Sequence, residues 1–200
     1  MNREISRRQA LVFGATGVVL AAGGPAFAET MQLSPVLLAE ARAALGRHAG
    51  RFSHVDRIGI ADFSRASRDP RLFVVDLVAG QTRSYLVAHG RGSDPAHTGW
   101  VERVSNTPGS YASSAGAYVT RDTYTGAHGR SMRLAGLDPT NDNAEARAIV
   151  VHAAWYVTPD IARATGKLGR SEGCFAVASD SLSPVLDQLG PGRLLFASRN

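Results

Sequence analysis

The sequence contains one cysteine, Cys174, among its 200 residues. A disulfide-stapled miniprotein is therefore excluded, because a bridge within one chain needs two thiols. No repeat of fixed period is present, and the composition is neither collagen-like nor that of a coiled coil. Charged residues make up 20% and hydrophobic residues 44%, which excludes an intrinsically disordered chain. The formal net charge of +5 is too small to predict nucleic-acid binding, so we expect no nucleic-acid partner.

Residues 1–28 have the features of a secretory signal peptide. Arg7 and Arg8 precede an apolar stretch at 10–22, and Ala26-x-Ala28 matches a small-residue cleavage site. The apolar stretch is shorter than the roughly 20 residues that a transmembrane helix needs, so we expect no stable membrane span after cleavage. The paired arginines are typical of a twin-arginine signal, but Ala10 departs from that consensus, so Sec export stays open. We expect a periplasmic protein whose remaining residues carry a net charge of +3.

Residues 29–200 predict a single mainly β or α+β domain, since many short apolar segments alternate with few helical ones and no linker divides them. Ser34 and Pro35 are a helix N-cap and first-turn pair, which predicts a helix from residue 35 that ends near Gly46 or Gly50. Further helices are expected at 158–165 and 181–189, and strands at 57–64, 71–78, 82–89, 131–134, 148–152 and 193–197. The polar segment 90–125 predicts a long binding loop.

A histidine and a cysteine form the candidate catalytic pair. His152 ends an apolar strand, and Cys174 follows 22 positions later in Ser171-Glu172-Gly173-Cys174. A histidine beside a thiol accepts its proton and makes it a nucleophile, so we expect the two side chains within hydrogen-bond reach. The alternatives are that Cys174 is a small core residue and that His152 is a buried structural histidine. Export argues against an exposed cysteine that has no function, because in an oxidising compartment an unpaired cysteine is either buried or used for chemistry.

The motif resembles the YkuD-type murein L,D-transpeptidase catalytic domain family, in a divergent branch. The blocks that carry the resemblance lie between residues 82 and 177. They are Asn106-Thr107-Pro108-Gly109, Gly129-Arg130-Ser131, Leu137-Asp138-Pro139-Thr140-Asn141 and, most specifically, Ser171-Glu172-Gly173-Cys174-Phe175-Ala176-Val177. The resemblance implies a β-sandwich-like catalytic domain with short helices.

It also implies a role for each motif residue. Cys174 would be the nucleophile and His152 the general base, oriented by the main-chain carbonyl of Ala153. Backbone N–H groups of Gly173 and Cys174 would hold the oxyanion, and Ser171 would shape the turn.

The sequence departs from the family pattern at three of these positions. Ala153 replaces a glycine, Glu172 replaces a second histidine, and Ala176 stands where many members carry a substrate-contacting arginine or asparagine. These changes affect substrate recognition rather than the Cys–His chemistry. We expect Glu172 to point away from the sulfur, because a carboxylate beside the thiol would oppose thiolate formation.

Other polar residues are candidates for substrate binding. His89 and Arg91, and His128, lie in glycine-rich segments at expected strand ends, and arginine is suited to gripping a substrate carboxylate. The alternative is that these are ordinary loop residues. The candidate substrate-binding residues are His89, Arg91, Tyr111, His128, Arg170 and Ser171, although tyrosines also pack loops onto sheets. Trp155 and Tyr156 are expected to pack beneath the cleft. No metal-ligand spacing is found, and we expect no metal and no cofactor.

The sequence therefore predicts an exported, monomeric cysteine acyltransferase that cross-links peptidoglycan stem peptides through a thioester. Whether the first or the third L,D bond of the stem is attacked stays open. The alternatives are an L,D-carboxypeptidase, in which water is the acceptor, and a non-catalytic wall-binding module.

Overall fold

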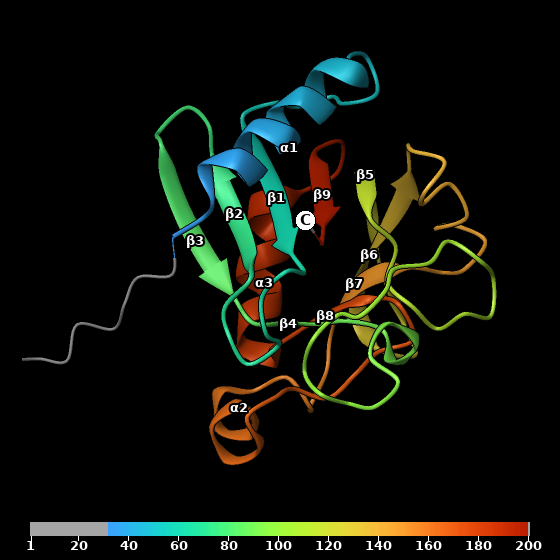
Figure 1. The fold of residues 1–200 in the computed structure, drawn as a ribbon. Coiled ribbons are helices and arrows are strands. Elements are labelled where there is room, and N and C mark those ends of the chain that lie inside the picture. Colours follow the sequence, from blue (N-terminus) through green and yellow to red (C-terminus); the bar gives the residue numbers. More distant parts are fainter. Residues whose placement is uncertain (1–31, 200) are drawn as a thin grey trace, which may run out of the picture. The chain divides into compact units, whose positions relative to one another are not determined.

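The computed structural model describes residues 32–199, so the expected signal peptide at 1–28 lies outside the described residues. Within residues 32–199 the chain forms one nine-stranded sheet in the order β3-β2-β1-β9-β5-β6-β7-β8-β4, with three α-helices and one short 3₁₀ helix, η1 (Figure 1). The strands are β1 (Arg57–Asp62), β2 (Leu72–Asp76), β3 (Gln81–Tyr85), β4 (Val87–Ala88), β5 (Gly116–Gly126), β6 (Gly129–Gly136), β7 (Val150–Ala153), β8 (Phe175–Val177) and β9 (Leu194–Ser198). The helices are α1 (Pro35–Arg47), η1 (Arg91–Ser93), α2 (Pro159–Thr165) and α3 (Ser179–Leu189). The predicted fold class, mostly β with a few short helices, is confirmed.

The β1–β2–β9 part of the sheet is buried on both faces. Alternating residues such as Ile58 and Ile60 pack on α1, whereas Ala61 on the other face joins the core that contains Leu186 and Leu189 of α3. Because both faces are covered, these strands consist of nearly continuous apolar residues instead of alternating polar and apolar ones. Figure 1 shows α1 and α3 on either side of these strands.

Helix α1 begins as predicted. The Ser34 hydroxyl accepts a hydrogen bond from the Leu37 N–H (3.5 Å), and Pro35 occupies the first turn, where its missing N–H costs nothing. The buried side chains of Leu37, Ala41 and Ala44 form the stripe that faces the sheet.

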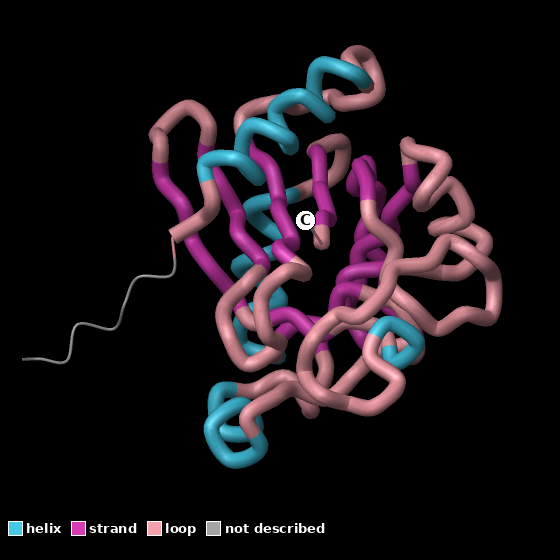
Figure 2. The backbone as a smooth tube through the Cα atoms, in the orientation of Figure 1, coloured by secondary structure: helices cyan, strands magenta, loops and turns pink. Residues whose placement is uncertain are grey.

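The structure corrects the prediction of a loop from 90 to 125. Strand β5 occupies Gly116–Gly126 and pairs with β6 on one side and β9 on the other. The segment 90–125 as a whole is polar and rich in glycine, so the sequence did not predict this strand. Tyr118 and Thr120 are nevertheless fully buried, because neighbouring strands supply their contacts. The remaining segment between β4 and β5 is loop apart from η1 (Figure 2).

One predicted strand is divided in the structure. The segment 82–89 is not one strand: β3 pairs with β2, whereas β4 pairs with β8 at the opposite edge of the sheet. The strand predicted at 193–197 is present as β9, which lies between β1 and β5. Long-range pairing of this kind is not determined by local sequence.

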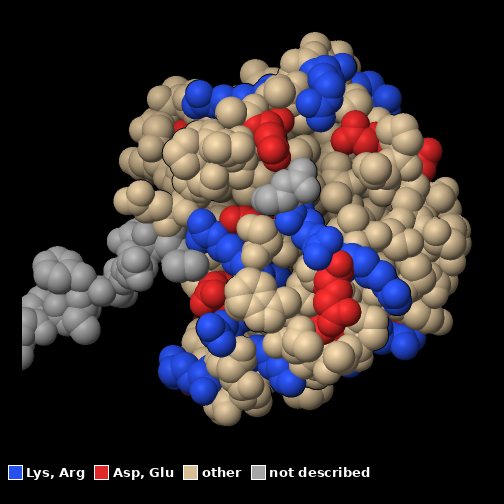
Figure 3. All heavy atoms as spheres, in the orientation of Figure 1, with Lys and Arg blue, Asp and Glu red and all other residues tan. Residues whose placement is uncertain are grey.

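Basic and acidic side chains are interspersed on the face drawn in Figure 3, with arginine and lysine in several separate groups. None of the helices found within residues 32–199 has the length and hydropathy that a transmembrane span requires.

Candidate active site

Parallel strands β7 and β8 are adjacent in the sheet, with His152 in β7 and Cys174 directly before β8. Val151 pairs with Phe175, and both side chains are buried in the core. Phe175 stacks on Phe63 (ring centroids 5.9 Å apart) and meets Tyr118 edge-on. Because successive side chains in a strand point to opposite faces, His152 and its pairing partner Ala176 face away from this core. Cys174 directly precedes β8, so the pairing of β7 with β8 brings together two segments separated by 22 positions.

The His152 ring is held by the backbone of the next residue. Its Nδ1 lies 2.8 Å from the carbonyl oxygen of Ala153. A carbonyl oxygen only accepts, so Nδ1 carries the hydrogen and Nε2 keeps its lone pair. The imidazole of His128, from the β5–β6 turn, stacks on this ring with centroids 4.4 Å apart. Burial lowers the pKa of His152 and the nearby His128 lowers it further, whereas the bond to Ala153 opposes this shift.

The Cys174 thiol is half-buried and donates to the carbonyl oxygen of Ala148 (3.6 Å), so in this geometry the proton is directed at backbone rather than at His152. Ala148 has a φ of +51°, an uncommon conformation for alanine. Burial raises the pKa of the thiol, and Glu172 adds to this, whereas the backbone of Val150 and the charge of Arg147 oppose it. At neutral pH the thiol is therefore protonated.

Ser171 closes the turn that presents the cysteine. Its hydroxyl donates to the Cys174 carbonyl (2.7 Å) and accepts from the Gly173 N–H (3.1 Å). The Gly173 N–H is thus engaged within the turn and does not point to a free site, unlike the oxyanion donor expected from the resemblance. Gly173 itself has a φ of +118°, and a Cβ there would lie 2.7 Å from the Ala112 carbonyl oxygen. The turn therefore requires glycine at this position.

Arg147 is a site residue that the sequence reasoning missed. Its guanidinium donates to the carbonyls of Ser105 (2.7 Å) and Ala112 and to the Ser114 hydroxyl (2.6 Å). It also lies beside Gly173, since a Cβ built there would be 3.0 Å from an Arg147 nitrogen. No spacing rule could have found it: the sequence shows only one arginine in a polar segment before β7.

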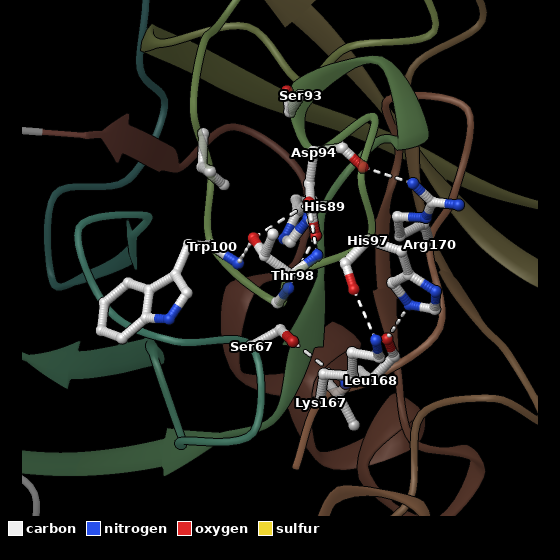
Figure 4. Close-up of polar contacts among 12 residues, drawn as sticks. Ser67, His89, Ser93, Asp94, His97, Thr98, Trp100, Lys167, Leu168 and Arg170 are labelled. Atoms are coloured by element: carbon white, nitrogen blue, oxygen red, sulfur yellow. Dashed lines mark hydrogen bonds and ion pairs between the residues drawn. The ribbon is translucent and has the colours of Figure 1, made fainter. Parts of the chain in front are cut away.

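Arg91, Tyr111 and Glu172 form a second group beside the cysteine turn. The Arg91 guanidinium lies 3.7 Å from the centre of the Tyr111 ring and donates to a Glu172 carboxylate oxygen (3.2 Å). The Glu172 carboxylate is thus engaged with Arg91 and largely exposed. Arg170 is anchored on the backbone carbonyls of Asp94 and Pro95 (Figure 4).

His89 does not line the site. It is completely buried, with Nδ1 2.7 Å from an Arg71 nitrogen and Nε2 3.3 Å from an Asp94 oxygen. Arginine can only donate, so Nδ1 accepts and Nε2 donates to Asp94. Burial, together with the charge of Arg71, lowers the pKa of His89 to about 3. Figure 4 shows this histidine among the polar contacts of the 94–100 loop, so it stabilises the loop rather than forming a cleft wall.

Trp155 is 80% exposed, so the expectation that it packs beneath the cleft was wrong. Its ring meets the Tyr156 ring edge-on, with centroids 5.7 Å apart, whereas Tyr156 is half-buried against the cluster that contains Val157 and Leu168.

A cavity of about 630 Å³ is lined by residues of α2, by the start of α3 and by the segments around residues 68–70 and 84–86, and neither His152 nor Cys174 lines it. Within residues 32–199, no three His, Cys, Asp or Glu side chains come together as a metal site would require.

Comparison with known proteins places this geometry in context. A family model described as an L,D-transpeptidase catalytic domain matches residues 29–198, which confirms the resemblance identified from the sequence. No curated protein matches the chain.

Several solved structures are similar. One is an L,D-transpeptidase from Mycobacterium smegmatis, with 12% identity, a TM-score of 0.42, and 72% of this chain and 58% of that chain covered. Another is an L,D-transpeptidase from Mycobacterium tuberculosis H37Rv, with 15% identity, a TM-score of 0.41, and 72% and 57% covered. A third is a helical cell shape determining protein from Campylobacter jejuni, with 10% identity, a TM-score of 0.45, and 84% and 57% covered. The chain thus spans less than two thirds of the length of each.

Proposed function

The chain belongs to the L,D-transpeptidase catalytic domain family, and from this membership we propose that it cross-links peptidoglycan stem peptides through a thioester on Cys174. The observation that carries the proposal is that His152 lies in β7 and Cys174 directly precedes the adjacent parallel strand β8, with Nδ1 of His152 bonded to the Ala153 carbonyl. That bond leaves Nε2 as the basic atom, which is what a general base for a thiol needs.

The proposed reaction has two halves. Nε2 of His152 takes the thiol proton while Sγ of Cys174 attacks the carbonyl carbon of an L,D peptide bond. The tetrahedral intermediate collapses, the departing D-residue amine takes the proton from His152, and a thioester remains. The amine of a neighbouring stem, such as a diaminopimelate side chain, then attacks the thioester and passes a proton to His152. Collapse of the second intermediate forms the new peptide bond, and the proton returns to the released sulfur.

The charges of the site favour proton transfer during the attack over a stored thiolate. Burial raises the pKa of Cys174 and lowers that of His152, so the resting pair is a neutral thiol and a neutral imidazole. The thiol must turn from Ala148 toward Nε2 before attack. Arg147 supports the developing negative charge on sulfur, since its guanidinium lowers the thiol pKa.

The oxyanion donor is the backbone N–H of Cys174 in this proposal. The Gly173 N–H is bonded to the Ser171 hydroxyl, so it contributes by shaping the turn. Substrate contacts are assigned to His128, which stacks on His152, and to Arg91 and Tyr111, which lie against each other beside Glu172.

The test uses purified protein and disaccharide-tetrapeptide fragments, with products identified by mass. We expect cross-linked dimers and loss of the terminal D-residue, and a stable mass increase at Cys174 with a carbapenem-type β-lactam. Cys174→Ser should lose both signals, and Arg42→Ala on the exposed side of α1 is the matched control that should keep them. Shortened stems without dimers would indicate an L,D-carboxypeptidase instead. Undiminished cross-linking by Cys174→Ser would refute the mechanism.

We also propose that residues 1–28 direct export and are then removed, on the strength of the Arg7-Arg8 start and the Ala26-x-Ala28 site. The intact mass of protein recovered from the periplasm should correspond to a chain that starts at Glu29. Recovery from the cytoplasm with Met1–Ala28 retained would contradict this.

A further inference from the structure

Three arginines surround a hollow next to the cysteine turn. The cavity measures about 290 Å³, and its lining residues are Arg91, Gly92, Pro95, Arg103, Tyr111 and Arg170. We call it the arginine hollow. This lining, among the residues described, includes three guanidinium groups and no carboxylate. The hollow is therefore a concentrated site of positive charge.

Two of these guanidinium groups are held by neutral backbone atoms. Arg103 donates from Nε to the Gly92 carbonyl (2.9 Å), and Arg170 donates from one terminal nitrogen to the carbonyls of Asp94 and Pro95. A carbonyl positions a guanidinium without cancelling its charge. Each group has five N–H donors, so bonds through one nitrogen leave donors for a ligand.

Arg91 differs, because it donates to Glu172 and stacks on Tyr111. That ion pair is exposed, so it contributes little energy and a ligand can compete with it. The hollow thus has two arginines that are poised for an anion and a third that can join them.

The hollow is joined rigidly to the catalytic turn. The Arg91 N–H donates to the Ser171 carbonyl (2.8 Å), and a Cβ on Gly90 would lie 2.8 Å from the Gly173 Cα, so the two backbones are in direct contact. Tyr111 also lines a smaller cavity of about 160 Å³ together with Arg147 and Glu172. The charges of Arg147 and Glu172 both act on the Cys174 thiol.

We propose that the arginine hollow binds a free carboxylate of the peptide whose acyl group Cys174 receives. This inference rests on the proposed function. Planar guanidinium groups pair with carboxylates through two parallel hydrogen bonds, which fixes orientation as well as adding affinity. A stem peptide carries such groups on its D-glutamate and its diaminopimelate. Anchoring one of them beside Tyr111 positions the L,D bond at Cys174.

The experiment measures binding without turnover. Cys174→Ala protein, which cannot form a thioester, is titrated calorimetrically with the L-Ala-γ-D-Glu-diaminopimelate-D-Ala tetrapeptide. The same peptide is then tested with the D-glutamate, the diaminopimelate or the terminal carboxyl converted to an amide. Arg103→Gln and, separately, Arg91→Gln are introduced into the same background, with Arg42→Gln as the matched surface control.

We expect Arg103→Gln and Arg91→Gln each to weaken binding about 10- to 100-fold, the usual range for hydrogen bonds to a charged group. One of the amidated peptides should bind weakly to the parent and be insensitive to these substitutions, which identifies the carboxylate. Arg42→Gln should bind as the parent does. Equal binding by all arginine variants, or equal binding of all amidated peptides, would overturn the inference.

The outcome is separable from the proposed function. If Cys174 fails to form a β-lactam adduct yet the tetrapeptide binds in an arginine-dependent manner, the chemistry is wrong and the hollow stands. If Cys174 is acylated normally but the Arg103 and Arg91 substitutions leave peptide affinity unchanged, the arginine hollow does not bind the peptide, and the proposed reaction at Cys174 is not affected.

Discussion

Replacing Gly173 by alanine tests how tightly the cysteine turn is constrained. The residue has a φ of +118°, where a side chain costs about 1–3 kcal/mol. The added Cβ would lie 2.7 Å from the Ala112 carbonyl oxygen and 2.8 Å from Ile149 Cδ1. Overpacking of this kind costs a further 1–3 kcal/mol or so. The expected loss is therefore about 2–6 kcal/mol.

Gly80→Ala is the matched control. Gly80 also has a positive φ, +67°, but no atom lies within 4 Å of a Cβ built there. It should lose only the conformational part, about 1–2 kcal/mol. For a domain of this size 1 kcal/mol shifts Tm by about 2–4 °C, so Gly173→Ala should melt about 5 °C below Gly80→Ala.

The two variants should also differ in reactivity. Because Gly173 directly precedes Cys174, displacement of the turn should slow β-lactam acylation by roughly 10²-fold, the cost of a misplacement near 1 Å. Gly80→Ala should react at the parent rate, since it lies in the β2–β3 connection. Calorimetric melting and adduct formation followed by intact mass check both points. If Gly173→Ala melts and reacts like Gly80→Ala, the close approach to Ala112 does not constrain the site.

Three other outcomes follow from the electrostatics and the hydrogen bonds. His152→Ala should slow acylation by about 10²–10⁴, the usual value of a positioned base, while circular dichroism stays native; an unchanged rate would remove His152 from the mechanism. Iodoacetamide alkylation of Cys174 should keep rising with pH beyond the ordinary thiol range, because burial raises its pKa, and a plateau below pH 8 would instead indicate a stored thiolate. The pKa of His89 is about 3 in the folded protein, below its ordinary 6.5. Between pH 6.5 and pH 3 the unfolded chain therefore binds a proton at His89 that the folded chain does not, so the folded state loses stability as the pH falls. The free energy of unfolding measured with urea should therefore be about 2–3 kcal/mol lower at pH 4.5 than at pH 7 because of this group, and His89→Gln should reduce that difference. The same change in unfolding free energy with pH in both proteins would contradict this.

Local chemistry explains which elements the sequence predicted well. The cap of α1 needs only Ser34 and Pro35, and the start of α2 needs only the Thr158 hydroxyl, which accepts from the Ile161 N–H (3.1 Å). Both signals act within one turn of helix, so they do not depend on the rest of the fold.

Strand β5 shows the opposite case. Its sequence contains valine, threonines and tyrosines, which favour strands, but it lies at the end of a long segment that is rich in glycine, serine and proline, and its pairing with β6 and β9 is not visible in the local sequence. Thr120, for example, is buried, and its hydroxyl lies within hydrogen-bond distance of the Gly190 and Arg193 carbonyls, 70 and 73 positions later. Such a partner is invisible in a local window of sequence.

The candidate site divides in the same way. The sequence alone suggested the candidate reactive groups, because a lone thiol in Ser-x-Gly-Cys and a histidine ending an apolar strand are chemical features of single residues and their immediate neighbours. Only the tertiary structure decided how their surroundings are used: it buried His89 with Arg71 and Asp94, brought Arg147 to the thiol, and joined Arg91, Arg103 and Arg170 around one hollow. The physical reason is the separation along the chain over which each effect acts. Bond chemistry and helix capping act over a few residues, whereas burial, charge and cavity shape depend on which distant segments the sheet brings together.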